Sequence, residues 1–127
     1  MFELRVEHSF PAGHALRGHP GKCANPHGHN YRVQIAVAGP RLDSIGLLMD
    51  FADLKRALRE VCERMDHAYL NDLPAFQTAN PSAENVAKYI YDEVSLLLAE
   101  PLGKAGFRLI EAVVQETDTA WAMYRPE

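Results

Sequence analysis

Alternating apolar and polar residues predict a β-strand at the start of the chain. From Phe2 to Phe10 the even-numbered residues are apolar, aromatic or histidine, and the odd-numbered residues are polar or charged. Because successive side chains of a strand point to opposite faces, this pattern places the apolar set on one face of a sheet. Pro11 and Gly13 predict the end of the strand, since proline has no N–H for the ladder.

Three further strands are predicted: His27 to Ala38, Phe107 to Thr117, and about Ala120 to Arg125. In the strand that begins at Phe107, both alternating sets contain apolar residues. One set is Phe107, Leu109 and Val113, and the other is Ile110, Ala112 and Val114. Burial of both faces would require packing against another subunit or closure of several sheets into a barrel.

Two amphipathic helices separate the strand pairs. From Asp50 to Met65 apolar residues recur three and four positions apart, and the first residue is a good N-cap. A second helix is predicted from about Ser82 to Ala99, again with its first residue as N-cap, and Pro101 and Gly103 are expected to end it. The order ββααββ predicts an α+β fold of antiparallel hairpins with both helices on one sheet face.

Length and charge exclude several classes of protein. The chain has 127 residues and a net charge of −4, from 13 basic and 17 acidic side chains, which fits a single domain over residues 1–127 and argues against a general nucleic-acid binder. No apolar run reaches the roughly 20 residues of a membrane span. Met1–Val6 lacks the character of a signal peptide. We therefore expect a cytoplasmic protein with neither nucleic acid nor membrane as a partner.

Three of the six histidines are candidate metal ligands. His27 and His29, separated by one glycine, place two imidazoles on the same face of a strand, where both can bind one ion. His14 follows the first strand, and the hairpin can bring it to the same end of the sheet. Three neutral imidazoles with an open fourth position form the ligand pattern of catalytic zinc. The alternative is that His27 and His29 are hydrogen-bonded strand residues without a metal.

Four more residues are candidates for acid–base chemistry or binding. Cys23, four residues before His27, is a fourth zinc ligand, a thiolate base beside the metal, or a free loop thiol. Asp66 can orient His67 as a proton relay, although this pair also suits a helix terminus. Glu116, predicted to share a face with apolar residues, can accept two N–H groups of a flat heterocycle or lie exposed at a turn.

The loop between the first two strands carries basic residues. Arg17, His19 and Lys22 can contact phosphate groups, although a solvated loop is the alternative. The second cysteine, Cys62, lies on the apolar stripe of the first helix and is interpreted as a core residue.

Six short segments have a joint order and spacing that is far more specific than any one of them. They are Phe10–His14, Cys23–Tyr31, Met49–Lys55, Asp66–Asn71, Asn80–Asn85 and Glu116–Thr119. Together they resemble the 6-pyruvoyl-tetrahydropterin synthase / 6-carboxy-tetrahydropterin synthase family over essentially the whole chain. The resemblance implies a tunnelling fold, in which a four-stranded antiparallel sheet is backed by two helices. It also implies that sheets join into a barrel in a trimer, and that two trimers form a homohexamer with active sites at subunit interfaces.

The resemblance also implies a site and a substrate. Zinc is bound by His14, His27 and His29 and acidifies the side-chain hydroxyls of 7,8-dihydroneopterin triphosphate. The resemblance implies that Cys23 is a thiolate base at the first side-chain carbon. It also implies that His67, supported by Asp66, is a proton shuttle. Glu116 is implied to anchor the pterin amino-pyrimidine edge, with Thr117 as its neighbour.

Two activities divide that family, and the spacing Cys-x3-His-Gly-His is similar to the bacterial carboxy form. We therefore expect a carbon–carbon lyase that releases acetaldehyde and triphosphate and leaves 6-carboxy-5,6,7,8-tetrahydropterin, on the route to queuosine. The first alternative is 6-pyruvoyl-tetrahydropterin synthase, which eliminates triphosphate without cleaving the side chain. More distant alternatives are a zinc hydrolase, which has no use for Cys23, and a non-catalytic oligomeric module with structural zinc.

Overall fold

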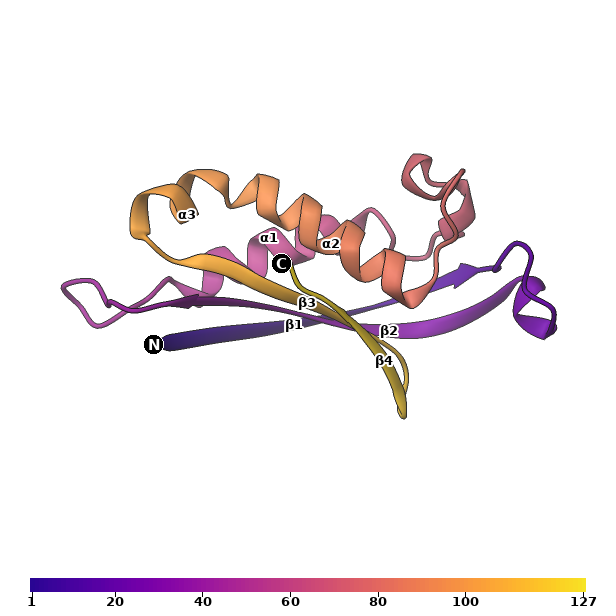
Figure 1. Cartoon of the computed structure of the whole chain (residues 1–127), viewed down its shortest axis with the longest axis horizontal. Coiled ribbons are helices and arrows are strands. Elements are labelled where there is room, and N and C mark those ends of the chain that lie inside the picture. The colour runs from indigo at the N-terminus through magenta and orange to yellow at the C-terminus, as the bar shows by residue number, and fades with distance from the viewer.

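A computed structural model describes residues 1–104 and 106–127 and contains an antiparallel sheet with its helices on one side (Figure 1). The strands lie side by side in chain order: β1 (Phe2–His14), β2 (His27–Gly39), β3 (Arg108–Thr117) and β4 (Ala120–Tyr124). The helices are α1 (Phe51–Glu63), α2 (Ala83–Leu97) and the short α3 (Ala99–Ala105). The predicted α+β order and the four-stranded antiparallel sheet are confirmed. The sheet of the single chain is open, with β1 and β4 at its edges.

β1 continues four residues beyond its predicted end, through Pro11 and Gly13 to His14. Proline is tolerated here because β1 is an edge strand. The Pro11 carbonyl points away from β2 and accepts a hydrogen bond from the His67 N–H at 2.7 Å, and the Gly13 N–H donates to Ala68 at 2.9 Å. Proline's missing N–H therefore falls on the side of the strand that β2 does not use. The segment around His67 covers this end of the edge.

The end of the helical region also differs from the prediction. α2 ends at Leu97, and Pro101 and Gly103 lie inside α3 instead of closing the last helix. Pro101 occupies the first turn of α3, where a helix makes no use of the N–H that proline lacks. The chain leaves α3 at Gly106, whose φ of 71° lies in the left-handed region that glycine adopts at little cost.

A bulge in β3 changes which of its residues share a face. Ala36 pairs with Glu111 and the next residue of β2, Val37, pairs with Leu109, so Ile110 is an extra residue. Leu109 therefore lies on the same face as the next two core residues of the strand, Ala112 and Val114, and all three are buried. The prediction that Leu109 lies on the face opposite Ala112 and Val114 is therefore wrong. The opposite face carries Glu111, which is buried between Arg5 and Arg125.

The core lies between the sheet and the helices. It is built from the helix-facing residues of the strands and the apolar stripes of α1 and α2, among them Phe10, Tyr31, Ile35, Leu58 and Ile90. Cys62 is buried in this core, as predicted, and burial raises the pKa of its thiol to about 12.

Both predicted N-caps are present. The Asp50 carboxylate accepts the Ala52 N–H at 2.8 Å, and the Ser82 hydroxyl accepts the Asn85 N–H at 3.1 Å. Each cap satisfies one of the N–H groups that a helix start leaves free. The Ser82 cap has a further consequence, because it fixes the turn in which the Pro81 carbonyl contacts the candidate site.

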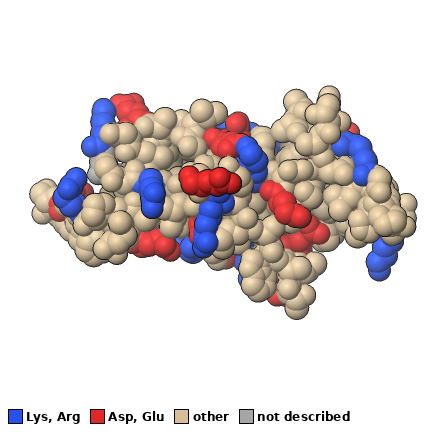
Figure 2. All heavy atoms as spheres, viewed as in Figure 1, with Lys and Arg blue, Asp and Glu red and all other residues tan. Residues whose placement is uncertain are grey.

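The outer surface is mixed in charge. Figure 2 shows lysine and arginine side chains interspersed with aspartate and glutamate over the face that it draws, in keeping with the net charge of −4. Within the described part of the chain, no helix combines the length and the apolar character of a membrane span.

Candidate functional site

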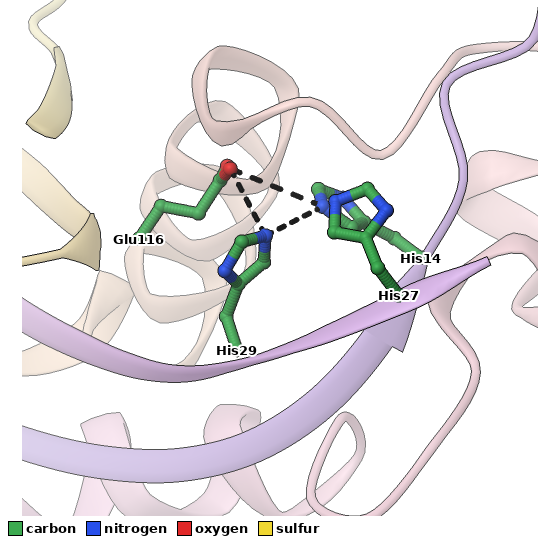
Figure 3. Close-up of side chains that lie close together, drawn as sticks. All are labelled: His14, His27, His29 and Glu116. Atoms are coloured by element: carbon green, nitrogen blue, oxygen red, sulfur yellow. Dashed lines mark hydrogen bonds and ion pairs between the residues drawn. The ribbon is translucent and has the colours of Figure 1, made fainter. Parts of the chain in front are cut away.

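Four side chains from three strands converge at one end of the sheet (Figure 3). His14 ends β1, His27 and His29 begin β2, and Glu116 lies near the end of β3. Their candidate ligand atoms all lie within 4.8 Å of one another. Register explains the convergence: His14 pairs with His27, and Ala12 pairs with His29. All four side chains belong to the sheet face that carries the helices.

Two backbone carbonyls set the orientation of the imidazole rings. The Nδ1 atom of His14 lies 2.7 Å from the Pro81 oxygen, and Nδ1 of His27 lies 2.8 Å from the Asn25 oxygen. Because a carbonyl can only accept, each Nδ1 carries the proton and each Nε2 keeps its lone pair. This outer contact is typical of metal-binding histidines, in which it fixes both tautomer and ring direction.

His29 connects the rings to the carboxylate. Its Nε2 atom lies 3.1 Å from Nε2 of His14 and 3.1 Å from Oε1 of Glu116. Since Nε2 of His14 has no proton, the hydrogen in this group belongs to Nε2 of His29. Burial lowers the pKa of His29, and the neighbouring His14 and His27 act in the same direction, against the opposite effect of Glu116. The ring is therefore neutral at pH 7, which is the form that binds a metal.

Glu116 lies beside the histidines, at a second irregularity in β3. Gln115 pairs with Trp121 and Thr117 pairs with Ala120, so the register shifts at Glu116. Bulges of this kind re-aim a side chain and are frequent beside active sites. The sequence placed Glu116 on a partly buried face but did not place it beside the histidines. The pairing of β2 with β3 does so, and it is a long-range contact without a local signal.

The donor set fits a divalent transition metal. Neutral imidazoles with converging Nε2 atoms, beside a carboxylate oxygen, are ligands that zinc prefers. Cys23 is not part of the group that the described residues form. It lies half-buried in the short 3-10 helix η1 (Lys22–Ala24), where its carbonyl accepts the Leu16 N–H at 2.9 Å.

Tyr31 lies beneath this group, and no role of its own at the site was assigned to it from the sequence. Its ring meets those of His14 and His29 edge to face, with centroid distances of 5.9 and 5.5 Å. The side chain is fully buried, and its hydroxyl has no hydrogen-bond partner among the described residues. Burial, reinforced by the Glu116 carboxylate, raises the pKa of Tyr31. The sequence signal for Tyr31 was a hydroxyl group two residues after His29, on a strand face that is apolar beyond it.

Asp66 and His67 form the predicted pair but lie apart from the histidine group. Nδ1 of His67 is 2.8 Å from the Asp66 carboxylate, and both side chains are exposed. They follow the end of α1 in a turn, and His67 has a positive φ of 56°. His67 borders a pocket of about 460 Å³ that is also lined by the paired residues Gly13 and Gly28 and by His29.

Glu116 and Thr117 line a second pocket of about 250 Å³, together with His29 and residues of β2 and β3. Glu116 therefore borders both the histidine group and a space beside it. A flat ligand in that space would meet the carboxylate on one side of the hairpin that joins β3 and β4.

The basic loop residues separate into two kinds. The Arg17 guanidinium donates to the carbonyls of Phe76 at 2.7 Å and Asn71 at 3.4 Å, and its backbone N–H donates to the Asn80 side chain. Arg17 therefore holds the loop to the chain segment before α2, which argues against it as a free phosphate contact. Lys22 and His19 are exposed, and Nδ1 of His19 accepts the N–H of Gly21.

Comparison with known proteins agrees with this geometry. The family model described as 6-pyruvoyl tetrahydropterin synthase matches residues 3–127. The chain is 37% identical over 131 residues to 6-carboxy-5,6,7,8-tetrahydropterin synthase of Bacillus subtilis, covering 99% of this chain and 86% of that protein. It is 39% identical over 111 residues to 6-pyruvoyl tetrahydrobiopterin synthase of Homo sapiens, covering 84% and 72%.

A solved structure extends the comparison to the fold. The 6-pyruvoyl tetrahydropterin synthase of Caenorhabditis elegans matches with a TM-score of 0.87 at 27% identity, covering 99% of this chain and 96% of that one. Sequence and fold thus agree over nearly the full length, and the matched residues include all four that converge at the end of the sheet. The chain belongs to the 6-pyruvoyl tetrahydropterin synthase family.

Proposed function

We propose that this chain is a 6-carboxy-5,6,7,8-tetrahydropterin synthase, which converts 7,8-dihydroneopterin triphosphate with release of acetaldehyde and triphosphate. The observation that carries the proposal is the convergence of His14, His27 and His29, with their Nε2 atoms directed at one point beside Glu116. Such a group suits a metal that binds vicinal hydroxyls of a substrate while a neighbouring carboxylate holds its ring.

Zinc is the proposed cofactor, with the three histidines as its ligands. When bound, zinc supplies Lewis-acid polarisation of the substrate's side-chain hydroxyls. The ring tautomers that the Pro81 and Asn25 carbonyls impose support this role, since they direct the lone pairs toward the ion before it arrives.

The other residues have separate tasks. Glu116 accepts two N–H groups from the amino-pyrimidine edge of the pterin, and Thr117 borders the same pocket. Cys23, in the loop that leads into His27, removes the proton from the first side-chain carbon as a thiolate. His67 shuttles the proton of the second hydroxyl, and Asp66 holds its Nδ1–H so that Nε2 is free to exchange the proton.

The position of Asp66 and His67 supports an active site shared between subunits. The pair is exposed and stands outside the group that the three histidines form with Glu116 among the described residues. An assembly such as the proposed homohexamer would bring the relay of one chain to the metal ligands of a neighbouring chain. The edge strands β1 and β4 are available for pairing between sheets.

The carboxy product is favoured by length and spacing together. The chain covers 86% of the Bacillus subtilis carboxy synthase but 72% of the Homo sapiens pyruvoyl synthase. Three residues separate Cys23 from the first histidine of the His-Gly-His motif, as in the bacterial form that it resembles. The pyruvoyl activity is the second candidate, because relatives of both names match at similar identity.

Product analysis tests the proposal. The zinc-loaded protein is incubated with 7,8-dihydroneopterin triphosphate, and acetaldehyde and the pterin products are quantified by chromatography. Acetaldehyde in equal amount to a carboxylated tetrahydropterin is expected. A pyruvoyl product without acetaldehyde would assign the second activity, and the absence of any turnover of this substrate would refute both.

A further inference from the structure

Two asparagine side chains hold the segment that follows His14. The amide of Asn80 accepts the Arg17 N–H and donates to the Arg17 carbonyl, both at 2.9 Å. The amide of Asn71 makes the same two hydrogen bonds to Ala15, at 2.9 and 2.8 Å. Each side chain takes the place of a strand partner, since paired residues of an antiparallel ladder exchange two such bonds. The hydrogen-bonding pattern of β1 thus continues beyond the end of the strand.

The residue between these two contacts the loop that carries Cys23. The Leu16 N–H donates to the Cys23 carbonyl at 2.9 Å. Residues 15–17 therefore bond alternately to the asparagines on one side and to the Cys23 loop on the other, as consecutive residues of a strand do. The place of the Cys23 loop consequently depends on the place of this segment.

Asn80 is also joined to the carbonyl that orients His14. Its own backbone carbonyl accepts a hydrogen bond from the Asn85 side chain at 2.9 Å. The oxygen of the next residue, Pro81, lies 2.7 Å from Nδ1 of His14. Pro81 and His14 are both buried, so the direction of the imidazole ring depends on this contact. Asn80 thus connects by its side chain to the segment after β1 and by its backbone to the orienting carbonyl.

Asn71 has only the first of these two connections. It lies in the 3-10 helix η2 (Leu70–Asp72). Among the described residues, neither of its chain neighbours makes a hydrogen bond to a histidine of the candidate site. The chain therefore contains two equivalent side-chain clamps on one segment, of which one is continuous with the contact behind His14.

We propose that Asn80 is a positioning residue, whose side-chain amide couples the Cys23 loop to the Pro81 carbonyl that orients His14. The inference rests on the proposed function and adds a residue that is neither ligand, base nor relay. Release of Arg17 frees the turn at Pro81 and the segment beside Cys23 together. One substitution is therefore expected to disturb both the direction of a proposed ligand and the place of the proposed base.

Asn80→Ala removes both hydrogen bonds to Arg17 and leaves every proposed ligand in the chain. Zinc should bind about 10-fold more weakly, as is usual when a partner behind a ligand is disturbed. In the metal-free chain, the amide protons of Leu16 and Arg17 should exchange with solvent faster than in the wild type, because the segment opens locally. Zinc affinity is measured by competition with a chromophoric chelator, amide exchange by NMR, and Tm by thermal unfolding.

Asn71→Ala is the matched control, because it removes the same two kinds of hydrogen bond from the same segment. It should lower the Tm as Asn80→Ala does and also speed the exchange of the Leu16 amide. Zinc affinity should stay near that of the wild type, since the turn at Pro81 keeps its contacts. An equal loss of zinc affinity in both variants would overturn the connection through Pro81.

Asn85→Ala is a milder second variant that does not touch Arg17. It removes the hydrogen bond to the Asn80 carbonyl but keeps the Asn85 N–H that the Ser82 cap accepts. Alanine favours the helix, so the Tm should stay close to that of the wild type while zinc binds more weakly. This variant decides the connection through Pro81 even where Asn80→Ala fails to fold.

The outcomes separate this inference from the proposed function. If Asn80→Ala lowers the Tm but keeps wild-type zinc affinity, Asn80 is a structural residue and the inference is refuted while the proposed function stands. If the exchange of the Leu16 amide is unchanged, the coupling to the Cys23 loop is refuted. A wild-type chain that takes up no zinc would refute the proposed function and the inference with it.

Discussion

Protons at the histidine group are placed by backbone atoms that lie outside it. The carbonyls of Pro81 and Asn25 hold the Nδ1–H groups of His14 and His27, so the Nε2 lone pairs point inward without any help from an ion. His14 is 1% exposed, which prevents water from competing for its ring. The ligands are therefore oriented by the fold before binding, and this reduces the cost of ordering them.

The proposed role of the Cys23 thiol distinguishes the lyase from the alternative functions. Cys23→Ala removes the proposed base and none of the clustered ligand atoms. Turnover should therefore fall by about 10²–10⁴-fold, while the zinc content stays at about one ion per chain. Steady-state rates and metal analysis check this. A zinc hydrolase would keep its activity in the variant. A structural-zinc module with Cys23 as ligand would instead lose zinc in Cys23→Ser, and either result would contradict the proposed role.

His67 has a backbone conformation that costs free energy. Its φ of 56° lies in the left-handed region, which is unfavourable for a non-glycine residue by about 1–2 kcal/mol. The side chain is 79% exposed, so little packing depends on it. We expect His67→Gly to abolish turnover while the free energy of unfolding in urea stays the same or rises by about 1 kcal/mol, part of the gain being offset by glycine's backbone entropy. His67→Ala keeps the strain and should show no gain, so a glycine variant less stable than the alanine variant would disprove this account.

At the level of elements, an ion-pair group ties both edges of the sheet to its centre. Glu111 of β3 lies 2.6 Å from Arg5 of β1 and 2.9 Å from Arg125, which follows β4. Glu111 is 3% exposed although it lies on the face without helices. Two arginines thus cover a carboxylate that the core does not cover.

This group predicts a pH dependence of stability. Burial raises the pKa of Glu111, but the hydrogen bonds and charges of Arg5 and Arg125 outweigh it, so its pKa in the folded chain lies below the usual 4.5. A lowered pKa stabilises the fold above the pKa of the unfolded chain, and the contribution is lost as pH falls through the folded value. Glu111→Gln should therefore lower the free energy of unfolding at pH 7 by about 1–2 kcal/mol. Its difference from the wild type should shrink below about pH 4.5.

Urea unfolding at a series of pH values measures this difference. Glu100→Gln is the control, because Glu100 pairs with Lys104 with both side chains more than three-quarters exposed. Exposed pairs of this kind contribute little, so the control should follow the wild type at every pH. A Glu111→Gln difference that is constant from pH 7 to pH 3 would show that the carboxylate charge is not what stabilises the sheet.

At the level of the whole molecule, the two halves of the proposed chemistry do not form one group among the described residues. The histidines converge with Glu116, whereas the Asp66–His67 pair is exposed beside the free edge of β1. The proposed function therefore places the relay of one chain beside the metal ligands of another.

Mixed assemblies test this arrangement directly. His29→Ala removes a proposed ligand and His67→Ala removes the relay, so each variant alone should be inactive. Assembled together at equal amounts, about a quarter of shared sites would combine intact ligands from one chain with an intact relay from another. Turnover of the mixture near that fraction of the wild-type rate is expected after joint refolding. A mixture as inactive as its components would place both functions within single chains.

Local sequence patterns predicted much of this fold. Alternation with a period of two located the four strands, helical spacing located α1 and α2, and the caps at Asp50 and Ser82 are present. The His-Gly-His spacing placed two rings on one face because neighbouring side chains of a strand alternate. Each of these signals arises from residues a few positions apart, which is why they can be read from the chain alone.

Other features depend on contacts between distant segments, and only the tertiary structure decided them. β1 passes through Pro11 because a segment more than fifty residues later covers its free edge. The bulge at Ile110 depends on how β3 pairs with β2 and puts Leu109 in the core, and the same strand pairing brings Glu116 beside His29. The sequence by itself determined the elements and the residue types of the site. Register, bulges and sheet face decided which of those residues meet, because backbone pairing over long separations leaves no local periodicity to read.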